Sequence, residues 1–265
     1  MSADNPEVTK RLEFALEVTR EAGWITLEHF RSDDLRVDRK ADDSPVTIAD
    51  RRAEEHLRHR IAEAFPDDGI IGEELPEVAG ASSYRWILDP IDGTKSFIHA
   101  VPLYTTLVAV EREGEPLLGV ILAPATDECV YAAIGQGAWY VHGKLPPKPA
   151  KANDRGPVSE CLFVTSEVSY FDEISRRDVY QKLEATARLT RSWGDAYGYL
   201  MVATGRAEVM VDPVVSLWDL AALLPVVEEA GGKFTDWEGK RTIHSGQSVA
   251  TNGRVHDEVL AVLMG

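Results

Sequence analysis

The sequence is poor in positive charge, and this shortage excludes one large class of binding proteins. Among its 265 residues, 28 are Lys or Arg against 44 Asp or Glu, which gives a formal net charge of −16. A protein that binds nucleic acid or an anionic membrane by charge needs a basic face to neutralise phosphates. No segment supplies such a face, so we predict no nucleic-acid partner and no membrane partner.

Cysteine and long apolar runs are also scarce. Cys129 and Cys161 are the only cysteines, too few for a disulfide framework and without the spacing of a zinc site. The first five residues are polar and acidic, unlike a secretory signal peptide, and no apolar run approaches the roughly 18 residues that span a membrane. We expect a cytoplasmic protein whose excess of acids serves solubility or holds cations.

Hydrophobic periodicity predicts a first half made of helices followed by strands. Helical spacing is present over residues 6–30 and 47–65. The β-rich runs that follow, separated by turn residues, are 70–72, 84–88, 104–110, 117–123, 130–134 and 138–141. This order indicates an α+β half containing an antiparallel meander.

Strands and helices alternate in the second half, which is typical of an α/β arrangement. The predicted helices cover 172–187, 196–204, 216–231 and the chain from about 255, with strands at 162–166, 189–192, 207–211, 233–236 and 248–252. The Pro-rich, charged segment 144–157 between the halves is the best linker candidate. We therefore predict domains at 1–145 and 146–265.

The most informative motif is an acidic one at the end of a predicted strand. Asp89 ends the apolar run, Pro90 fixes the backbone, and Asp92 follows three residues after Asp89, before Gly93 and Thr94. Two hard carboxylates with a main-chain carbonyl between them suit Mg²⁺. The alternative is an Asp-Pro turn followed by a helix cap.

Three further acidic positions have both a plain and a chemical interpretation. Glu73 follows a short apolar strand and is either a solvated loop residue or a metal ligand. Asp219 lies in the first turn of a helical pattern, where it either complements the helix dipole or faces a site. Asp50 follows Thr47 at capping-box spacing and either caps a helix or orients a hydroxyl or a water.

In this order along the chain, these pieces resemble the inositol monophosphatase-like branch of the fructose bisphosphatase superfamily. The matching motifs are Val-Thr-x-x-Asp at 46–50, Gly-Glu-Glu at 72–74, Asp-Pro-Ile-Asp-Gly-Thr at 89–94, Trp-Asp at 218–219 and Glu-Ala-Gly-Gly at 229–232. The resemblance implies a layered αβαβα sandwich and a metal-dependent, lithium-sensitive phosphatase acting on a small phosphate ester. Because the family commonly forms dimers, we expect a homodimer.

The resemblance also implies a set of metal ligands, for two to three Mg²⁺ ions. Glu73, Asp89 and the carbonyl of Ile91 would hold the first ion. Asp89, Asp92 and Asp219 would hold the second, and Glu73 would help a weaker third.

The remaining chemistry implied by the resemblance concerns the nucleophile and the phosphate. Asp50 would hydrogen-bond Thr94, and with Glu73 this pair forms the implied catalytic set, which activates a metal-bound water. The N–H groups of Gly93 and Thr94 would bind the phosphoryl oxygens at a helix N-terminus. Lys40 would approach the metal site.

Departures from the inositol pattern indicate a cationic substrate. Asp195 stands where inositol enzymes have a small or neutral residue, Asp212 replaces the family's usual Glu, and Lys95 follows Asp-Gly-Thr. These features resemble the histidinol-phosphatase subgroup, whose substrate carries an ammonium and a protonatable imidazole. The alternative for Asp195 is that it caps the helix that begins at residue 196. Separately, Arg191 either binds phosphate or holds Asp195 or Asp212 in place.

The sequence therefore predicts a Mg²⁺-dependent phosphatase that hydrolyses histidinol phosphate in histidine biosynthesis. An inositol monophosphatase or a broad sugar-phosphate phosphatase is the first alternative, and an adenosine bisphosphate phosphatase is weaker. A non-catalytic metal- or phosphate-binding protein is the alternative from another class.

Overall fold

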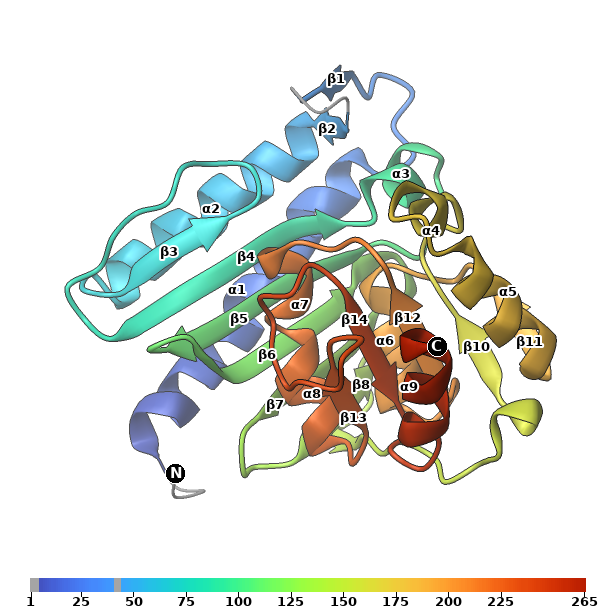
Figure 1. Cartoon of the computed structure of the whole chain (residues 1–265). Coiled ribbons are helices and arrows are strands. Elements are labelled where there is room, and N and C mark those ends of the chain that lie inside the picture. The colour runs from blue at the N-terminus through green and yellow to red at the C-terminus, as the bar shows by residue number, and fades with distance from the viewer. Residues whose placement is uncertain (1–4, 41–43) are drawn as a thin grey trace.

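Helices and strands stack in five layers, αβαβα, in the computed structural model, which describes residues 5–40 and 44–265 (Figure 1). The predicted layered sandwich is confirmed. Within the described residues, no helix combines the length and the apolar character needed to cross a membrane.

The first layer consists of two long helices. The N-cap of α1 (Pro6–His29) is Asn5, whose side chain accepts a hydrogen bond from the Glu7 N–H. The N-cap of α2 (Ile48–Ala64) is Thr47. A two-stranded ribbon of β1 (Val37–Arg39) and β2 (Pro45–Thr47) leads into α2. The apolar faces of both helices pack on one face of the first sheet.

The first sheet has the order β3-β4-β5-β6-β7-β8-β9. Its strands are β3 (Gly69–Gly72), β4 (Tyr84–Asp92), β5 (Thr105–Arg112), β6 (Glu115–Ala123), β7 (Glu128–Ala133), β8 (Ala138–His142) and β9 (Lys148–Pro149). Strands β4 to β8 form the predicted antiparallel meander, β9 adds an antiparallel strand that was not predicted, and β3 joins β4 in parallel. β9 lies inside the predicted linker and extends this sheet to Pro149.

The second sheet is mixed and has the order β11-β10-β12-β14-β13. Its strands are β10 (Leu162–Val164), β11 (Leu189–Arg191), β12 (Val209–Asp212), β13 (Lys233–Thr235) and β14 (Ser248–Thr251). β10 lies parallel to both β11 and β12, while β14 is antiparallel to β12 and β13. The carboxyl ends of β10 and β12 therefore lie at the same edge of this sheet.

The middle helices fill the space between the two sheets, and the last layer covers the outer face of the second sheet. α6 (Ala196–Ala203) and α8 (Leu223–Glu229) share one core with inward side chains of both sheets. α4 (Ser169–Glu173), α5 (Arg177–Thr186) and α9 (His256–Met264) pack on the other side. Three short elements complete the chain: α3 (Thr94–Ile98) and the 3₁₀ turns η1 (Pro124–Thr126) and η2 (Val158–Glu160).

Side-chain alternation along β4 explains why this strand is buried on both faces. Trp86 and Leu88 belong to the core under α1 and α2, whereas Ile87 belongs to the core shared with α6 and α8. Because successive side chains of a strand point to opposite faces, an unbroken apolar run predicts burial on both sides.

Two predicted helices are each interrupted in the structure. The 172–187 prediction is wrong at its start, since α4 and α5 are separated near Ser175, whose φ is +56°. The 216–231 prediction becomes α7 (Leu217–Leu220) and α8. Pro225 has no N–H to donate to the carbonyl of Ala221, so one continuous ladder of hydrogen bonds is impossible there.

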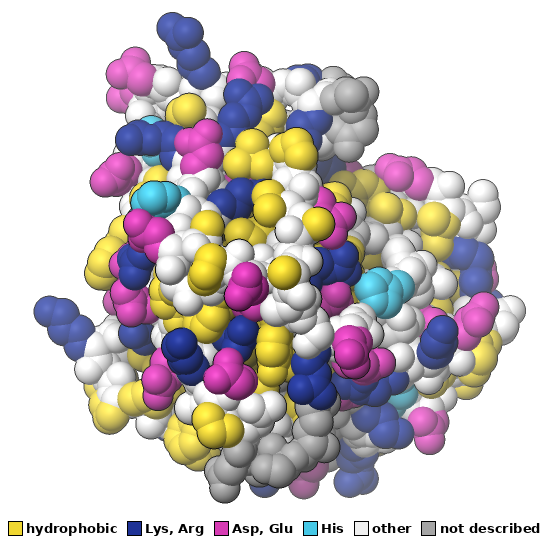
Figure 2. Space-filling view, turned by 90° about the vertical axis from the view of Figure 1, so that its left-hand side faces the viewer, with side chains coloured by type: hydrophobic (Ala, Val, Ile, Leu, Met, Phe, Trp, Pro, Cys, Tyr) yellow, Lys and Arg dark blue, Asp and Glu magenta, His cyan; other side chains and the backbone are white. Residues whose placement is uncertain are grey.

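Charged side chains of both signs are exposed on one face of the molecule (Figure 2). On the face that Figure 2 shows, Lys and Arg side chains are interspersed with Asp and Glu rather than gathered in one patch. Surface pairs such as Arg51 with Asp38 and Arg60 with Glu17 account for part of this mixing.

We predict that Gly119→Ala destabilises the protein. Gly119 lies on β6 directly under the start of α8, where an added Cβ would stand 2.1 Å from the carbonyl oxygen of Ala222. Overpacking of this kind costs about 1–3 kcal/mol, which urea unfolding will measure. Gly69→Ala in the same sheet is the comparison, because its Cβ would stand 3.3 Å from the backbone N of Gly80, a tight contact that a small shift relieves, so a smaller loss of stability is expected. Equal stability of both variants would contradict the close approach of β6 and α8.

Candidate active site

A cavity of about 580 Å³ opens where the two halves of the chain meet. The β4–α3 segment lines one side, and the segments that follow β10 and β12 line the other. The starts of α6 and α7 also reach it. Most of the residues singled out in the sequence lie here.

An irregularity at the end of β4 brings Asp89 and Asp92 to the cavity. The sequence predicted that this strand ends before Asp89, but β4 continues through Pro90 to Asp92. Its pairing with β5 shifts register between the two aspartates. The shift replaces the expected turn, and the Thr106 hydroxyl donates to the carbonyl of Pro90 across it (2.9 Å). A bulge re-aims a side chain, so both carboxylates face the same space.

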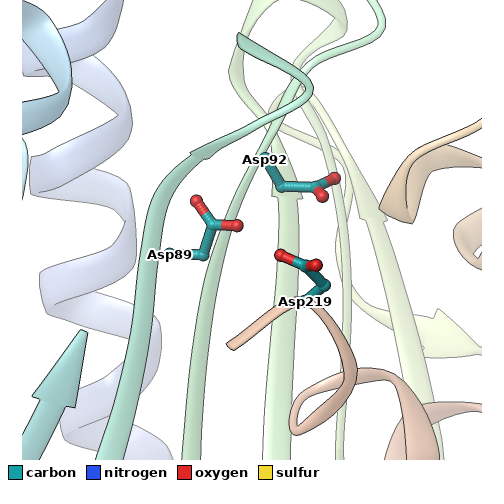
Figure 3. Close-up of side chains that lie close together, drawn as sticks. All are labelled: Asp89, Asp92 and Asp219. Atoms are coloured by element: carbon teal, nitrogen blue, oxygen red, sulfur yellow. The ribbon is translucent and has the colours of Figure 1, made fainter. Parts of the chain in front are cut away.

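Asp219 joins them from the other half of the chain. It lies in the first turn of α7, where its Oδ2 accepts the N–H of Ser216 (2.7 Å), so it both caps the helix and faces the site. One oxygen from each of Asp89, Asp92 and Asp219 lies within 4.8 Å of the others. Figure 3 shows the three side chains converging from β4 and α7.

This carboxylate cluster is electrostatically unfavourable in the protein alone. Burial, together with repulsion from the neighbouring acids, raises the pKa of Asp89 and of Asp92 well above the usual range. Burial raises the pKa of Asp219 to about 7. Asp89 Oδ1 is buried and has no hydrogen-bond partner among the described residues. An orphaned carboxylate oxygen inside a cluster of hard oxygen donors fits a site for Mg²⁺.

Glu73 lies beside this cluster but is paired with a lysine. Lys40 Nζ lies 2.7 Å from Glu73 Oε1 and 2.7 Å from Glu74 Oε1, and all three groups are partly buried. Burial alone would lower the pKa of Lys40, but its hydrogen bonds to the two glutamates outweigh burial and raise that pKa. The predicted approach of Lys40 to the site is confirmed.

The predicted hydrogen bond between Asp50 and Thr94 is wrong in this structure. Asp50 Oδ2 accepts from the N–H and the hydroxyl of Thr47 (2.8 and 2.6 Å), which forms the capping box of α2. The Thr94 hydroxyl donates instead to the carbonyl of Ile91 (3.1 Å), the predicted main-chain ligand. The cap uses one Asp50 oxygen, while Oδ1 is buried without a partner among the described residues. Burial raises the pKa of Asp50 to about 6.

Gly93 allows the two halves of the cavity to come together. Its φ of +82° is left-handed, and a Cβ there would lie 2.6 Å from Asp195 Oδ2. Glycine is therefore required both by the backbone and by the adjacent carboxylate.

The alternative in which Asp195 caps α6 is wrong. Asp195 occupies the cap position but makes no side-chain cap bond. Asp92 Oδ2 takes that place, accepting the Ala196 N–H (2.6 Å) and the Thr105 hydroxyl (2.8 Å). The Asp195 carboxylate is thus not used by the helix, and burial with repulsion from Asp212 raises its pKa to about 6.

Asp212 is buried at the end of β12 and is held by hydroxyls. Its Oδ1 accepts from the N–H and the hydroxyl of Ser166 (3.0 and 2.8 Å), and its Oδ2 accepts from Tyr199 (3.0 Å). The same Ser166 hydroxyl accepts the Asp195 N–H (2.9 Å). One serine therefore connects the two acids that were predicted to select the substrate.

Arg191 is not brought to the cavity. It is exposed at the end of β11, donates to the carbonyl of Thr190 (2.7 Å) and lies over the ring of Trp193. Neither of the alternative contacts considered for it, with Asp195 or with Asp212, forms in this structure, and Asp212 is held by Ser166 and Tyr199 instead.

Sequence reasoning missed several residues that line the cavity, among them a polar group that follows β10. Ser166, Glu167 and Tyr170 follow the end of β10. Lys95 bonds to both Glu167 and Tyr170 and so links α3 to the second half. The usable signal was the run Thr-Ser-Glu directly after a buried strand, where parallel sheets place their ligand-binding residues.

Comparison with known proteins agrees with this geometry. The model described as the inositol monophosphatase family matches residues 7–264. A Chlorobaculum parvum protein named histidinol-phosphatase is 43% identical over 97% of both chains, and a Streptomyces coelicolor protein of the same name is 37% identical over 97% of this chain and 98% of its own.

Solved structures agree as well. The Thermotoga maritima IMPase has a TM-score of 0.85 at 32% identity, covering 96% of this chain and 97% of that one. The extragenic suppressor protein suhB from Bartonella henselae has a TM-score of 0.88 at 26% identity, covering 96% and 98%. With a family model that spans nearly the whole chain and full-length relatives above 30% identity, this protein belongs to the inositol monophosphatase family.

Proposed function

We propose that the chain is a Mg²⁺-dependent phosphomonoesterase that hydrolyses histidinol phosphate to histidinol and phosphate. The observation that carries the proposal is the pair of acids, partly buried Asp195 and buried Asp212, that line the same cavity as the carboxylate cluster of Asp89, Asp92 and Asp219. Support also comes from the full-length relatives named histidinol-phosphatase.

The metal would be held by residues that are otherwise unfavourably placed. Asp89, Asp92 and Asp219 supply carboxylates, and Glu73 and the Ile91 carbonyl stand next to them. When bound, Mg²⁺ supplies charge neutralisation of the phosphoryl oxygens, activation of a water near neutral pH and stabilisation of the leaving alkoxide. A cation also relieves the repulsion that raises the pKa of the cluster.

The chain's own groups would orient the nucleophile and the phosphate. Asp50 Oδ1 is unpartnered among the described residues and its pKa is about 6, so it would accept a proton from the attacking water near neutral pH. The Thr94 hydroxyl would help to orient that water. Gly93 and Thr94 would present N–H groups at the start of α3 to the phosphoryl oxygens.

The second half of the chain would select the ester. Histidinol phosphate carries an ammonium and a protonatable imidazole, and a cation beside Asp195 would favour its ionised form. Asp212 would add negative potential while Ser166 and Tyr199 hold it in place.

Hydrolysis of inositol phosphate is the second candidate. The hydroxyls of Ser166 and Tyr199 lie beside Asp212 and would suit a neutral polyol. A Rhizobium meliloti relative named inositol-1-monophosphatase is 33% identical over 83% of both chains. Phosphate release from both esters separates the candidates, and the higher kcat/KM identifies the substrate.

We predict that Asp92→Asn lowers kcat by at least about a hundredfold and reduces the rise in Tm on adding Mg²⁺. The single oxygen Oδ2 accepts both hydrogen bonds of Asp92, so the amide oxygen of Asn can keep them while the ligand charge is lost. Phosphate release and thermal unfolding with and without Mg²⁺ measure both effects.

Asp236→Asn is the matched control, because Asp236 is buried, accepts backbone N–H groups and does not line the cavity. Wild-type turnover by Asp92→Asn in Mg²⁺ would refute the proposed metal site.

We predict that Asp195→Ala raises KM for histidinol phosphate by about tenfold to a hundredfold and changes KM for inositol phosphate much less. A charge-assisted contact is worth about 1.5–3 kcal/mol, and only histidinol phosphate offers a cation. Initial rates with both esters measure the ratio. An equal change in KM for both would exclude Asp195 as the group that recognises the cation.

A further inference from the structure

Glu54 is a fully buried acid that none of the steps above uses. It lies on α2, and its exposed fraction is 0%. Its Oε2 accepts the N–H of Glu74 (2.8 Å) and its Oε1 accepts the N–H of Leu75 (3.2 Å). The carboxylate therefore binds the backbone of the loop between β3 and β4 at the two residues that directly follow Glu73.

Arg58, one turn further along α2, binds the same loop. Its Nε donates to Glu54 Oε1 (2.8 Å), and its Nη2 and Nη1 donate to the carbonyls of Leu75 (2.8 Å) and Pro76 (2.9 Å). Glu54 thus binds the N–H groups of the loop and Arg58 binds its carbonyls. We call these two side chains the loop clamp.

The loop clamp is one of several contacts on this loop: the Glu73 N–H donates to the carbonyl of Leu88 (3.2 Å), Val78 pairs with Ile70, and Glu77 forms an ion pair with Arg85. Residues 73–77 form no helix or strand. The side chains of Glu73 and Glu74 both form ion pairs with Lys40. The clamp also requires a close approach, because a Cβ on Gly72 would stand 2.3 Å from Glu54 Oε1.

Burial of an ionised carboxylate costs free energy, and an apolar residue at this buried position of α2 would avoid that cost. Burial indeed raises the pKa of Glu54, and the hydrogen bonds from Glu74 and Arg58 oppose that rise. What the carboxylate supplies, and an apolar side chain does not, is a fixed position for the backbone at residues 74 and 75.

The same helix also carries Asp50, one turn before Glu54. Asp50 is buried and does not line the cavity, but the negative charge of Glu73 is among the causes that raise its pKa. Glu54 therefore ties the Glu73 loop to the helix that positions the Asp50 carboxylate, so that these two groups keep a constant separation.

We infer that Glu54 is a positioning residue for the metal ligand Glu73, and that it acts through the backbone of residues 74 and 75. The inference rests on the proposed function in one respect, since it takes Glu73 to be a ligand of Mg²⁺. Groups that orient metal ligands typically change metal affinity 10- to 100-fold when they are removed.

The test is Glu54→Gln with Mg²⁺ alone as the probe. Both oxygens of Glu54 accept hydrogen bonds, so the NH₂ group of Gln must face a donor and one contact is lost. We expect the Kd for Mg²⁺, measured by titration calorimetry without substrate, to rise about tenfold. The Mg²⁺ concentration for half-maximal activity should rise in parallel, with kcat recovering at high Mg²⁺.

Glu208→Gln is the matched control. Glu208 is also a buried glutamate that accepts a backbone N–H, from Leu162 (2.6 Å), and has a nearby arginine, Arg155. It lies at the opposite end of β10 and β12 from the cavity. This variant should lose stability without a change in the Kd for Mg²⁺.

The outcomes separate the inference from the function on which it rests. Wild-type Mg²⁺ affinity in a folded Glu54→Gln, or an equal loss in Glu208→Gln, overturns the role of Glu54 and leaves the phosphatase proposal intact. Failure of the wild-type protein to bind Mg²⁺ overturns both. If Glu54→Gln does not fold, Arg58→Lys tests the same clamp, since Lys keeps the charge but loses the fork to two carbonyls. An unchanged Kd in that variant overturns the inference.

Discussion

Repulsion among three carboxylates is the constraint around which this structure is arranged. Asp89 and Asp92 lie on β4 and Asp219 lies on α7, far along the chain, yet one oxygen of each lies within 4.8 Å of the others. Like charges at such distances in a buried site raise each other's pKa, and they do so here. The five-layer packing holds the carboxylates together against this repulsion. A divalent cation between them would offset the repulsion, and the same arrangement would then be a binding site.

The site depends on contacts between the two halves, because neither half contains all of it. α6 and α8 share one apolar core with both sheets, and this core keeps the two sheets at a constant distance. Asp92 crosses the junction by capping α6 through the N–H of Ala196, and Lys95 crosses it by bonding to Glu167. The groups proposed for catalysis and those proposed for recognition are thus connected by short polar contacts.

Local patterns in the sequence predicted the strands and the acidic residues of the cavity, and the family resemblance predicted the layers. Apolar runs located the strands, an acidic motif at a strand end located Asp89 and Asp92, and helical spacing placed Asp219 in the first turn of a helix. The sequence did not predict where hydrogen bonds would go when two partners compete. Asp50 was expected to contact Thr94, but the backbone of its own helix takes one oxygen. One prediction was that Asp195 caps α6, but Asp92, which is distant in sequence, accepts the N–H of Ala196 instead. The exposed position of Arg191 likewise depends on packing that no local pattern encodes.

The bond between Asp92 and the Ala196 N–H has a consequence for redesigning this enzyme fold. A designer who wishes to change the accepted ester would vary the side chains around Asp195, which lie on the recognition side of the cavity. Position 196 tolerates no proline in such a library, since the ring would remove the N–H that Asp92 accepts and would release that carboxylate from its orientation. Residues 195 and 196 are neighbours in the chain and both are restricted, residue 195 by its positive φ of +52° and residue 196 by the backbone donor that it must keep.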